Sequence, residues 1–263
     1  MPEQPSSPGR RRPLVAGNWK MYKTVAEVEP YVAELRPLMP ASEDVEVGLC
    51  VPYTALAATV AAARGTEIRV SAQNMHQDPE GGFTGEVSAP MLLELGVQVV
   101  VLGHSERRGL FGETDRALQE KVPAALEAGL QPILCVGESE EERDAGETQR
   151  RLRHQVQEAI EKVPDERLAQ MVVAYEPVWA IGSGRSASPE QAQEAIAFVR
   201  ALVGDRSEAA AQAVRVLYGG SVKGENADEL LSLPDVDGAL VGGASLDPSS
   251  LAAIAVAAAS AGA

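Results

Sequence analysis

Side chains that can move protons or bind anions follow directly after short apolar runs of the sequence. The runs and the side chains that follow them are 14–17 with Asn18 and Lys20, 98–102 with His104, and 171–175 with Glu176. An imidazole and a carboxylate can act as general acid and general base. Because Glu176 stands between an apolar run and an apolar loop, we expect burial to raise its pKa toward the value that a general base needs. The chemistry predicted is proton transfer with an ammonium and an amide nearby.

Two glycine pairs follow two further apolar runs. They are Gly219 and Gly220, followed by Ser221, after the run 214–218, and Gly242 and Gly243 after the run 239–241. Glycine lets the backbone approach a ligand closely, with several amide N–H groups pointing toward it. Each pair alone is typical of a simple turn, just as Asn18 or Lys20 alone is typical of a solvated turn. The two pairs together favour a phosphate-binding site.

The segment after Glu176 predicts a hinged lid. Pro177 stiffens one end of this segment, and Gly182 and Gly184 give the other end conformational freedom. Residues 182–187 also match the dinucleotide pattern G-x-G-x-x-G/A, but they begin well past the end of the preceding apolar run, so we reject a nucleotide loop. The sequence contains no phosphate-loop motif and no zinc-ligand motif, and we therefore expect no metal site.

Short apolar runs alternate with longer amphipathic segments along the chain, which is typical of alternating strands and helices. The predicted strands are 14–17, 45–51, 68–72, 98–102, 131–136, 171–175, 214–218 and 239–241. Several are apolar on both faces, which indicates parallel strands covered by helices. Eight alternations without a linker favour one closed (β/α)₈ barrel over two domains. Such barrels carry their chemistry at the carboxyl ends of the strands, and many hold a phosphate after the last two strands.

The helix ends can also be predicted. Pro30 lies inside the segment 24–39 and is expected to mark the start of the first helix. Ser188, followed by Pro and then Gln191, predicts a capping box, and Gly129 predicts a helix end. The apolar stripe of one further charged helix is expected to consist of Leu152, Val156, Ile160 and Val163.

Charge and composition limit the partners. The 263 residues include 23 Lys and Arg against 38 Asp and Glu, a net charge of −15 that disfavours nucleic acid and anionic membranes. An anionic substrate must therefore meet a local cation or oriented amides. Residues 1–12 are expected to form a flexible tail, with Arg10 to Arg12 solvated, before a barrel domain at 13–263. Without a secretory signal or cysteine-rich spacing, and with Cys50 and Cys135 in apolar runs, we expect a cytoplasmic protein.

Five motifs carry a resemblance to a known family. They are GNWK at 17–20, GHSERR at 103–108, AYEPVWAIGSG at 174–184, YGGSV at 218–222 and VGGASL at 241–246. In this order and spacing the sequence resembles triosephosphate isomerases, from about Pro13 to the last helix. The resemblance implies a (β/α)₈ barrel that interconverts dihydroxyacetone phosphate and D-glyceraldehyde 3-phosphate through an enediolate, without a cofactor, in glycolysis and gluconeogenesis.

The resemblance also implies roles for individual residues. Glu176 matches the catalytic base, and His104 matches an electrophile that acts as a neutral imidazole. Lys20 and Asn18 match substrate contacts near the developing negative charge. The positions that match the phosphate site are Gly182, Ser221, Gly242 and Gly243, and the supporting positions are Ser105 and Glu106.

The loop of residues 73–86, from Gln73 to Glu86, is too long for a plain connection between a strand and a helix. It resembles the interdigitating loop of the family, which implies a homodimer in which Thr84 approaches the neighbouring active site and Glu86 pairs with Arg107. The lid departs from the family pattern at Ser183 and Arg185, where Thr and Lys are expected. These departures keep the chemistry of the side chains but could change lid kinetics.

Two other functions compete with the isomerase. A sugar-phosphate epimerase also binds phosphate on a barrel, but such enzymes generally need metal ligands, so a metal requirement would favour it. A barrel retained as a binding or regulatory protein is disfavoured because a base, an electrophile and a lysine are all present. A measured turnover would exclude that second alternative.

Overall fold

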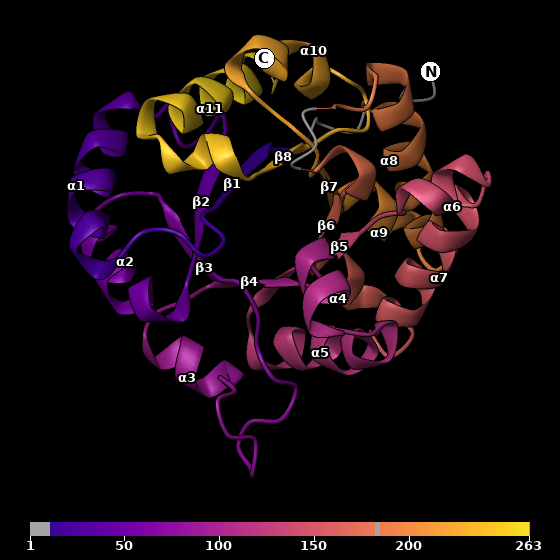
Figure 1. The fold of residues 1–263 in the computed structure, drawn as a ribbon, viewed down its shortest axis with the longest axis horizontal. Coiled ribbons are helices and arrows are strands. Elements are labelled where there is room, and N and C mark those ends of the chain that lie inside the picture. The colour runs from indigo at the N-terminus through magenta and orange to yellow at the C-terminus, as the bar shows by residue number, and fades with distance from the viewer. Residues whose placement is uncertain (1–10, 182–184, 263) are drawn as a thin grey trace, which may run out of the picture.

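The computed structural model describes residues 11–181 and 185–262 and shows one closed parallel barrel surrounded by helices (Figure 1). The strands pair in sequence order, from β1 to β8, and β8 closes the barrel against β1. The strands are β1 (Leu14–Asn18), β2 (Glu46–Val51), β3 (Arg69–Ala72), β4 (Val99–Leu102), β5 (Gln131–Val136), β6 (Val172–Tyr175), β7 (Arg215–Tyr218) and β8 (Gly238–Val241). The predicted (β/α)₈ barrel is confirmed, and each predicted strand overlaps an observed one.

Helices cover the outside of the barrel, as the predicted parallel sheet requires. The α-helices are α1 (Val25–Leu35), α2 (Leu56–Ala62), α3 (Ala89–Glu94), α4 (Ser105–Phe111), α5 (Asp115–Ala128), α6 (Glu140–Asp144), α7 (Thr148–Ile160), α8 (Pro189–Gly204), α9 (Glu208–Ala213), α10 (Gly224–Leu231) and α11 (Pro248–Gly262). Short 3₁₀ helices are η1 (Arg36–Leu38), η2 (Tyr53–Ala55), η3 (Asp165–Gln170), η4 (Val178–Ala180) and η5 (Gly243–Leu246). Within the described ranges no helix is long and apolar enough to cross a membrane.

The strand residues point alternately into the barrel and toward the helices, which produces two apolar layers. The inner layer includes Ala16, Cys50, Val101, Cys135 and Leu217. The outer layer packs neighbouring strand residues against the apolar stripes of the helices. Burial on both faces explains the continuous apolar runs and fixes the register that brings the carboxyl ends of all strands to one rim.

Most predicted helix signals are confirmed. Ser188 accepts a hydrogen bond from the Gln191 amide in a capping box, and Gly129 ends α5 with a φ of +93°. The apolar stripe on and just after α7 is fully buried at Leu152, Val156, Ile160 and Val163.

The prediction for Pro30 is wrong, because α1 begins earlier, at Val25, and contains the proline. The carboxylate of Glu27 accepts the backbone N–H of Thr24 at 2.7 Å, which caps the helix before Pro30. The cap provides partners for N–H groups at the start of the helix. The helix therefore tolerates the loss of the one hydrogen bond that Pro30 cannot donate.

The predicted solvated arm is also wrong at Arg11. Its Nε lies 2.7 Å from Oδ1 of Asp237, just before β8, and the side chain is largely buried. Arg12 donates to the carbonyl oxygen of Val45, just before β2, at 3.2 Å. Since β1 pairs with both β8 and β2, these two contacts fasten the chain to both neighbours of its first strand.

A charged layer closes the barrel at the amino ends of the strands. Glu46 begins β2, and its two carboxylate oxygens lie 2.8 Å from Nη1 of Arg69 and 3.0 Å from Nη1 of Arg215. Both guanidinium groups also donate to Oε1 of Gln131. Burial alone would raise the pKa of Glu46, but the two arginines outweigh it, and the pKa is lowered.

We predict that Glu46→Gln lowers the free energy of unfolding by about 2–4 kcal/mol at pH 7, because it leaves Arg69 and Arg215 without a counter-charge. A carboxyl with a lowered folded-state pKa stabilises the fold above its unfolded-state pKa, and this stability is lost as the pH falls through the folded-state pKa. Urea unfolding at several pH values should therefore show the two proteins converging in acid. An equal difference at all pH values would contradict the ionic origin.

Candidate active site

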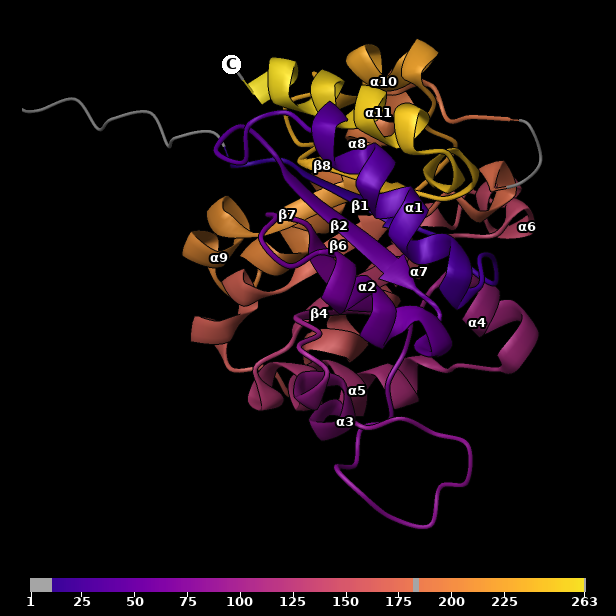
Figure 2. The ribbon, with the colours of Figure 1, turned by 90° about the vertical axis from the view of Figure 1, so that its left-hand side faces the viewer.

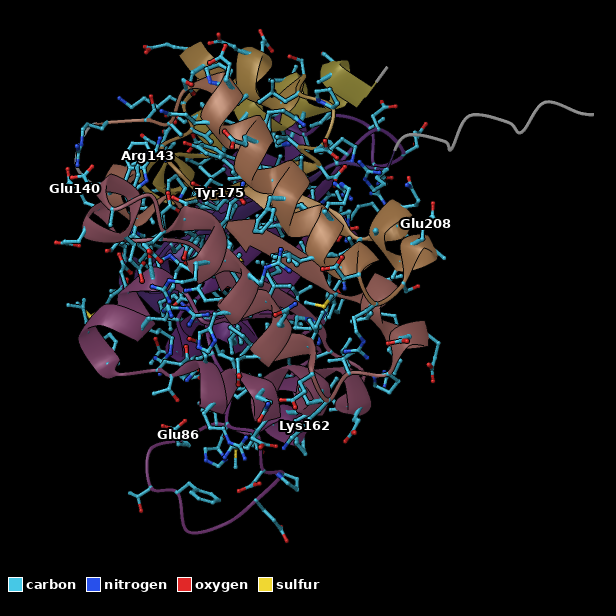
Figure 3. All side chains as sticks on the ribbon, turned by 90° about the vertical axis from the view of Figure 1, so that its right-hand side faces the viewer. Glu86, Glu140, Arg143, Lys162, Tyr175 and Glu208 are labelled. Atoms are coloured by element: carbon cyan, nitrogen blue, oxygen red, sulfur yellow. The ribbon has the colours of Figure 1, made fainter. Side chains whose placement is uncertain are left out.

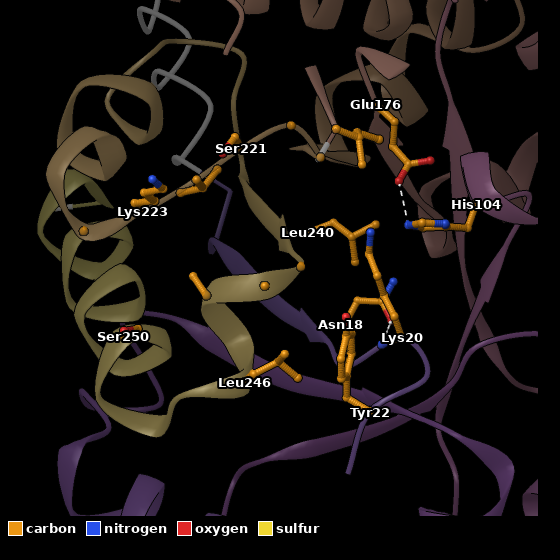
Figure 4. A pocket seen from close by; sticks show the side chains of 18 of the residues that line it. Asn18, Lys20, Tyr22, His104, Glu176, Ser221, Lys223, Leu240, Leu246 and Ser250 are labelled. Atoms are coloured by element: carbon orange, nitrogen blue, oxygen red, sulfur yellow. Dashed lines mark hydrogen bonds and ion pairs between the residues drawn. The ribbon is translucent and has the colours of Figure 1, made fainter. Parts of the chain in front are cut away.

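A cavity of about 880 Å³ opens at the carboxyl ends of the strands (Figure 4). The site residues predicted from sequence that line it are Asn18, Lys20, His104, Glu176, Ser221, Gly242 and Gly243. They come from the ends of β1, β4, β6, β7 and β8 and are far apart in sequence. Gly182 and Ser183 lie outside the described residues. The supporting residues Ser105 and Glu106 begin α4 beside the cavity.

Glu176 is buried, and both of its carboxylate oxygens have partners. Oε1 lies 3.0 Å from Nε2 of His104, and Oε2 accepts the backbone N–H of Ser105 at 2.8 Å. Glycine on both sides lets the residue pack this closely. A Cβ on Gly137 would lie 1.7 Å from the Glu176 carbonyl oxygen, and one on Gly219 would lie 2.9 Å from its Cγ.

The expectation of a raised pKa for Glu176 is wrong for this arrangement. Burial raises the pKa, but His104, the Ser105 amide and Lys20 together outweigh it, so the pKa of Glu176 is lowered. The sequence pattern predicted the burial correctly. It did not reveal the donors that the fold places around the carboxylate.

His104 caps the amino end of α4. Its Nδ1 accepts the backbone N–H of Glu106 at 3.2 Å, so we assign the ring proton to Nε2, which faces Glu176. This contact favours a neutral imidazole, as does the amino end of a helix. Burial lowers the pKa of His104, but the carboxylates of Glu176 and Glu106 raise it more, and the pKa is raised while Glu176 faces the ring.

Lys20 lies next to the glycine-rich end of the cavity. Its Nζ lies 2.6 Å from Oε1 of Glu106. A Cβ on Gly242 would lie 3.4 Å from Cε of Lys20, so the lysine side chain passes beside the loop after β8. The ammonium therefore lies between the imidazole side of the cavity and its glycine-rich side.

Glu138 is a buried carboxylate near the site that our sequence analysis did not single out. It follows β5, and its Oε1 accepts the Tyr175 hydroxyl at 3.1 Å and the Trp179 indole N–H at 2.9 Å. The Val178 N–H also donates to its carbonyl oxygen at 3.2 Å. Its position after an apolar run was the same signal that identified Glu176. Glu138 thus fixes the segment that follows β6.

Trp179 is half-buried. The guanidinium of Arg143 lies 4.4 Å from its ring centroid, and that of Arg185 lies 5.8 Å away. Arg185 also forms an ion pair with Glu140 at 2.8 Å. Glu140 and Arg143 both project from α6 at the same edge of the molecule (Figure 3).

The closed barrel and the carboxylate–imidazole pair at its strand ends define the class: a (β/α)₈-barrel enzyme equipped for proton transfer. A family model described as triosephosphate isomerase matches residues 13–258. The chain belongs to the triosephosphate isomerase family and is an isomerase, as the sequence predicted.

Named relatives support this assignment over nearly their whole length. The triosephosphate isomerase of Solibacter usitatus is 51% identical, over 93% of this chain and 98% of the relative. That of Symbiobacterium thermophilum is 52% identical, over 95% of this chain and 98% of the relative. That of Moorella thermoacetica is 51% identical, over 93% and 98%.

Proposed function

We propose that this chain interconverts dihydroxyacetone phosphate and D-glyceraldehyde 3-phosphate by general acid–base catalysis, without a cofactor. The convergence of Glu176, His104 and Lys20 in one cavity with the glycine-rich ends of β7 and β8 carries this proposal. In the forward direction Glu176 removes a proton from the hydroxymethyl carbon, which gives an enediolate. The proton then returns to the neighbouring carbon, while proton exchange between the two oxygens completes the aldehyde.

Glu176 must leave its partners before it can act as the base. The substrate oxygens take its place at Nε2 of His104, and the carboxylate turns toward the carbon-bound proton. It thereby loses the contacts with His104 and Ser105 that lower its pKa, while closure of the loop from Val178 excludes water. Both changes increase the basicity of the carboxylate at the moment when a strong base is needed.

His104 acts as the electrophile. Once the Glu176 carboxylate has moved away, its contribution to the raised pKa of His104 is lost. Burial, which is the largest influence and lowers the pKa, then exceeds the remaining contribution of the Glu106 carboxylate, and the Glu106 N–H still occupies Nδ1. The imidazole is then neutral and donates its Nε2–H to the substrate oxygen on which negative charge develops. Ser105 and Glu106 support this role by holding the ring and the Lys20 ammonium.

The phosphate group binds at the opposite end of the cavity. We assign it to the backbone amides around Ser221, Gly242 and Gly243, with Gly182 as a fourth position. Lys20 and Asn18 contact the substrate between the phosphate and the reacting carbons. Lys20 supplies positive charge that an anionic substrate needs in a chain with a net charge of −15.

The decisive test is a coupled assay of the purified, metal-stripped chain with dihydroxyacetone phosphate. We expect fast formation of glyceraldehyde 3-phosphate that a chelator does not change. A requirement for a divalent metal would instead favour a sugar-phosphate epimerase. The absence of turnover in folded, dimeric protein would favour a binding or regulatory role.

The family resemblance and the shape of the loop 73–86 together support a homodimer. The loop projects away from the barrel between β3 and α3 (Figure 2). Two contacts hold the loop together. The backbone N–H of His76 donates to the Val87 carbonyl oxygen at 2.8 Å, and the His76 ring packs against the Phe83 ring with centroids 4.0 Å apart. We propose that this loop docks against a second copy, with Thr84 near the neighbouring active site and Glu86 paired with Arg107.

Sedimentation should give twice the chain mass of 27.7 kDa. We expect Thr84→Arg to shift the protein to the monomer and to lower turnover, because the bulky charged side chain sits at the loop tip. Ala213→Arg, on an exposed position of α9, is the matched control and should remain dimeric. A monomeric wild-type chain with full turnover would refute the dimer.

We further propose a cytoplasmic location and a single catalytic domain at 13–263, preceded by a segment whose last two residues, Arg11 and Arg12, contact the barrel. Both cysteines, Cys50 and Cys135, are free and buried, and burial raises the pKa of Cys50 to about 12. Free, buried thiols are compatible with a reducing compartment, and neither cysteine takes part in a disulfide.

A further inference from the structure

The loop after β1 holds Lys20 in an unusual backbone conformation. Its φ is +52°, in the left-handed region that residues other than glycine rarely adopt. The Lys20 N–H donates to Oδ1 of Asn18 at 3.0 Å, which stabilises one side of this conformation. The Trp19 N–H, one residue earlier, donates to the Cys50 carbonyl oxygen on β2 at 3.0 Å. A strained conformation persists only where the surrounding structure enforces it.

Gln73 holds the carbonyl group of Lys20, whereas Asn18 holds its N–H group. It directly follows β3, and its amide nitrogen donates to the Lys20 carbonyl oxygen at 2.9 Å. The same nitrogen reaches the Cys50 carbonyl oxygen at 3.0 Å and Oδ1 of Asn18 at 3.2 Å. One half-buried side chain thus joins the ends of three neighbouring strands around the backbone of Lys20.

We infer that Gln73 is a positioning residue for Lys20, holding its strained backbone so that the ammonium points into the cavity (Figure 4). There the ammonium lies beside the Glu106 carboxylate and close to Gly242. This inference rests on the proposed role of Lys20 toward the anionic substrate. Without the Gln73 donor, the Lys20 carbonyl oxygen loses its partner and the backbone relaxes from positive φ. The ammonium then shifts away from the substrate, and a displacement of about 1 Å can reduce the rate up to about 10²-fold.

The chemistry of the side chain explains why glutamine is suited to this position. All three acceptors are oxygen atoms, two carbonyl and one amide. A carboxylate has the same shape as the glutamine amide but donates no hydrogen bond and repels these oxygens. A methionine has a similar length and donates nothing. The two substitutions remove the same interaction in different ways.

The test compares Gln73→Met and Gln73→Glu with the wild type by steady-state kinetics and thermal unfolding. We expect both variants to lower kcat/KM by about 10- to 100-fold, with Gln73→Glu at least as impaired as Gln73→Met. If Gln73→Met does not fold, the isosteric Gln73→Glu provides the same test. Gln119→Met is the matched control: this buried glutamine on α5 bonds Glu161 and Arg116, so its loss should affect stability and leave kcat/KM unchanged.

A double-mutant cycle with Lys20→Met separates positioning from a general structural role. We expect Gln73→Met to have little further effect on kcat/KM once the ammonium is absent. If Lys20→Met is impaired but Gln73→Met is not, or if Gln73→Met is equally harmful in both backgrounds, the inference is overturned. If Lys20→Met itself retains full activity, the proposed role of Lys20 is wrong, which is a distinguishable failure.

Discussion

Glu176→Gln is expected to lower kcat by about 10²- to 10⁴-fold, the range that a positioned general base contributes. The amide keeps the size of the side chain but cannot accept a carbon-bound proton. Glu176→Asp should also be severely impaired, because the shorter side chain withdraws the carboxylate from the reacting carbons. Coupled assays at saturating dihydroxyacetone phosphate measure this loss directly.

The fold should survive the Glu176→Gln substitution. The wild-type carboxylate accepts from His104 and Ser105, and a glutamine oxygen can still accept one of these hydrogen bonds. Circular dichroism and thermal unfolding should therefore show a folded protein. Glu208→Gln, on the exposed first turn of α9, is the matched control and should retain full turnover. Unchanged turnover in both Glu176→Gln and Glu176→Asp would refute the proposed mechanism.

His104→Gln should lower kcat by about 10²- to 10³-fold, as expected for the loss of one donor to a developing oxyanion. It should also raise the pKa of the Glu176 carboxyl in the free protein. Burial raises that pKa, and His104 is the largest influence that opposes burial. When the imidazole is removed, the balance shifts toward the protonated carboxyl. A ¹³C NMR titration, with the signal assigned through Glu176→Gln, measures the shift without interference from the substrate phosphate.

His154→Gln is the matched control for this second prediction. His154 projects from α7, and its side chain is half exposed, with Nε2 lying 3.5 Å from Asp115 and away from the cavity. Both kcat and the Glu176 titration should match the wild type in this variant. If His104→Gln retained full kcat, another group would have to polarise the substrate oxygen. If it lowered the pKa of Glu176, the electrostatic account of the pair would be wrong.

Much of the fold could be predicted because its signals are local. Continuous apolar strands such as 99–102 and 172–175 reflect burial on both faces, and this pattern is visible without knowing the partners of each strand. The caps at Ser188 and Gly129 depend on a few consecutive residues. The start of α1 was predicted wrongly at Pro30. The rule that proline begins or interrupts a helix was outweighed by the cap at Thr24, six residues earlier in the chain.

The candidate site was predictable for a related reason. In a parallel barrel every strand ends at the same rim, so residues that directly follow the strands converge whatever their separation in sequence. This rule brings Asn18, His104 and Glu176 into one cavity. Glu138 also follows a strand, and only its hydrogen bond with the Trp179 indole showed that it lies beside the candidate site.

The sequence by itself determined the barrel, the family and the identity of the side chains around the cavity. Only the tertiary structure decided their ionisation and backbone conformation. The backbone N–H of Ser105, which helps to lower the pKa of Glu176, lies 71 positions from Glu176 in the sequence. The side-chain amide of Gln73, which holds Lys20, lies 53 positions from Lys20. Strand order and burial are encoded by side-chain type, whereas a pKa or a strained φ depends on hydrogen bonds that exist only once the barrel has closed.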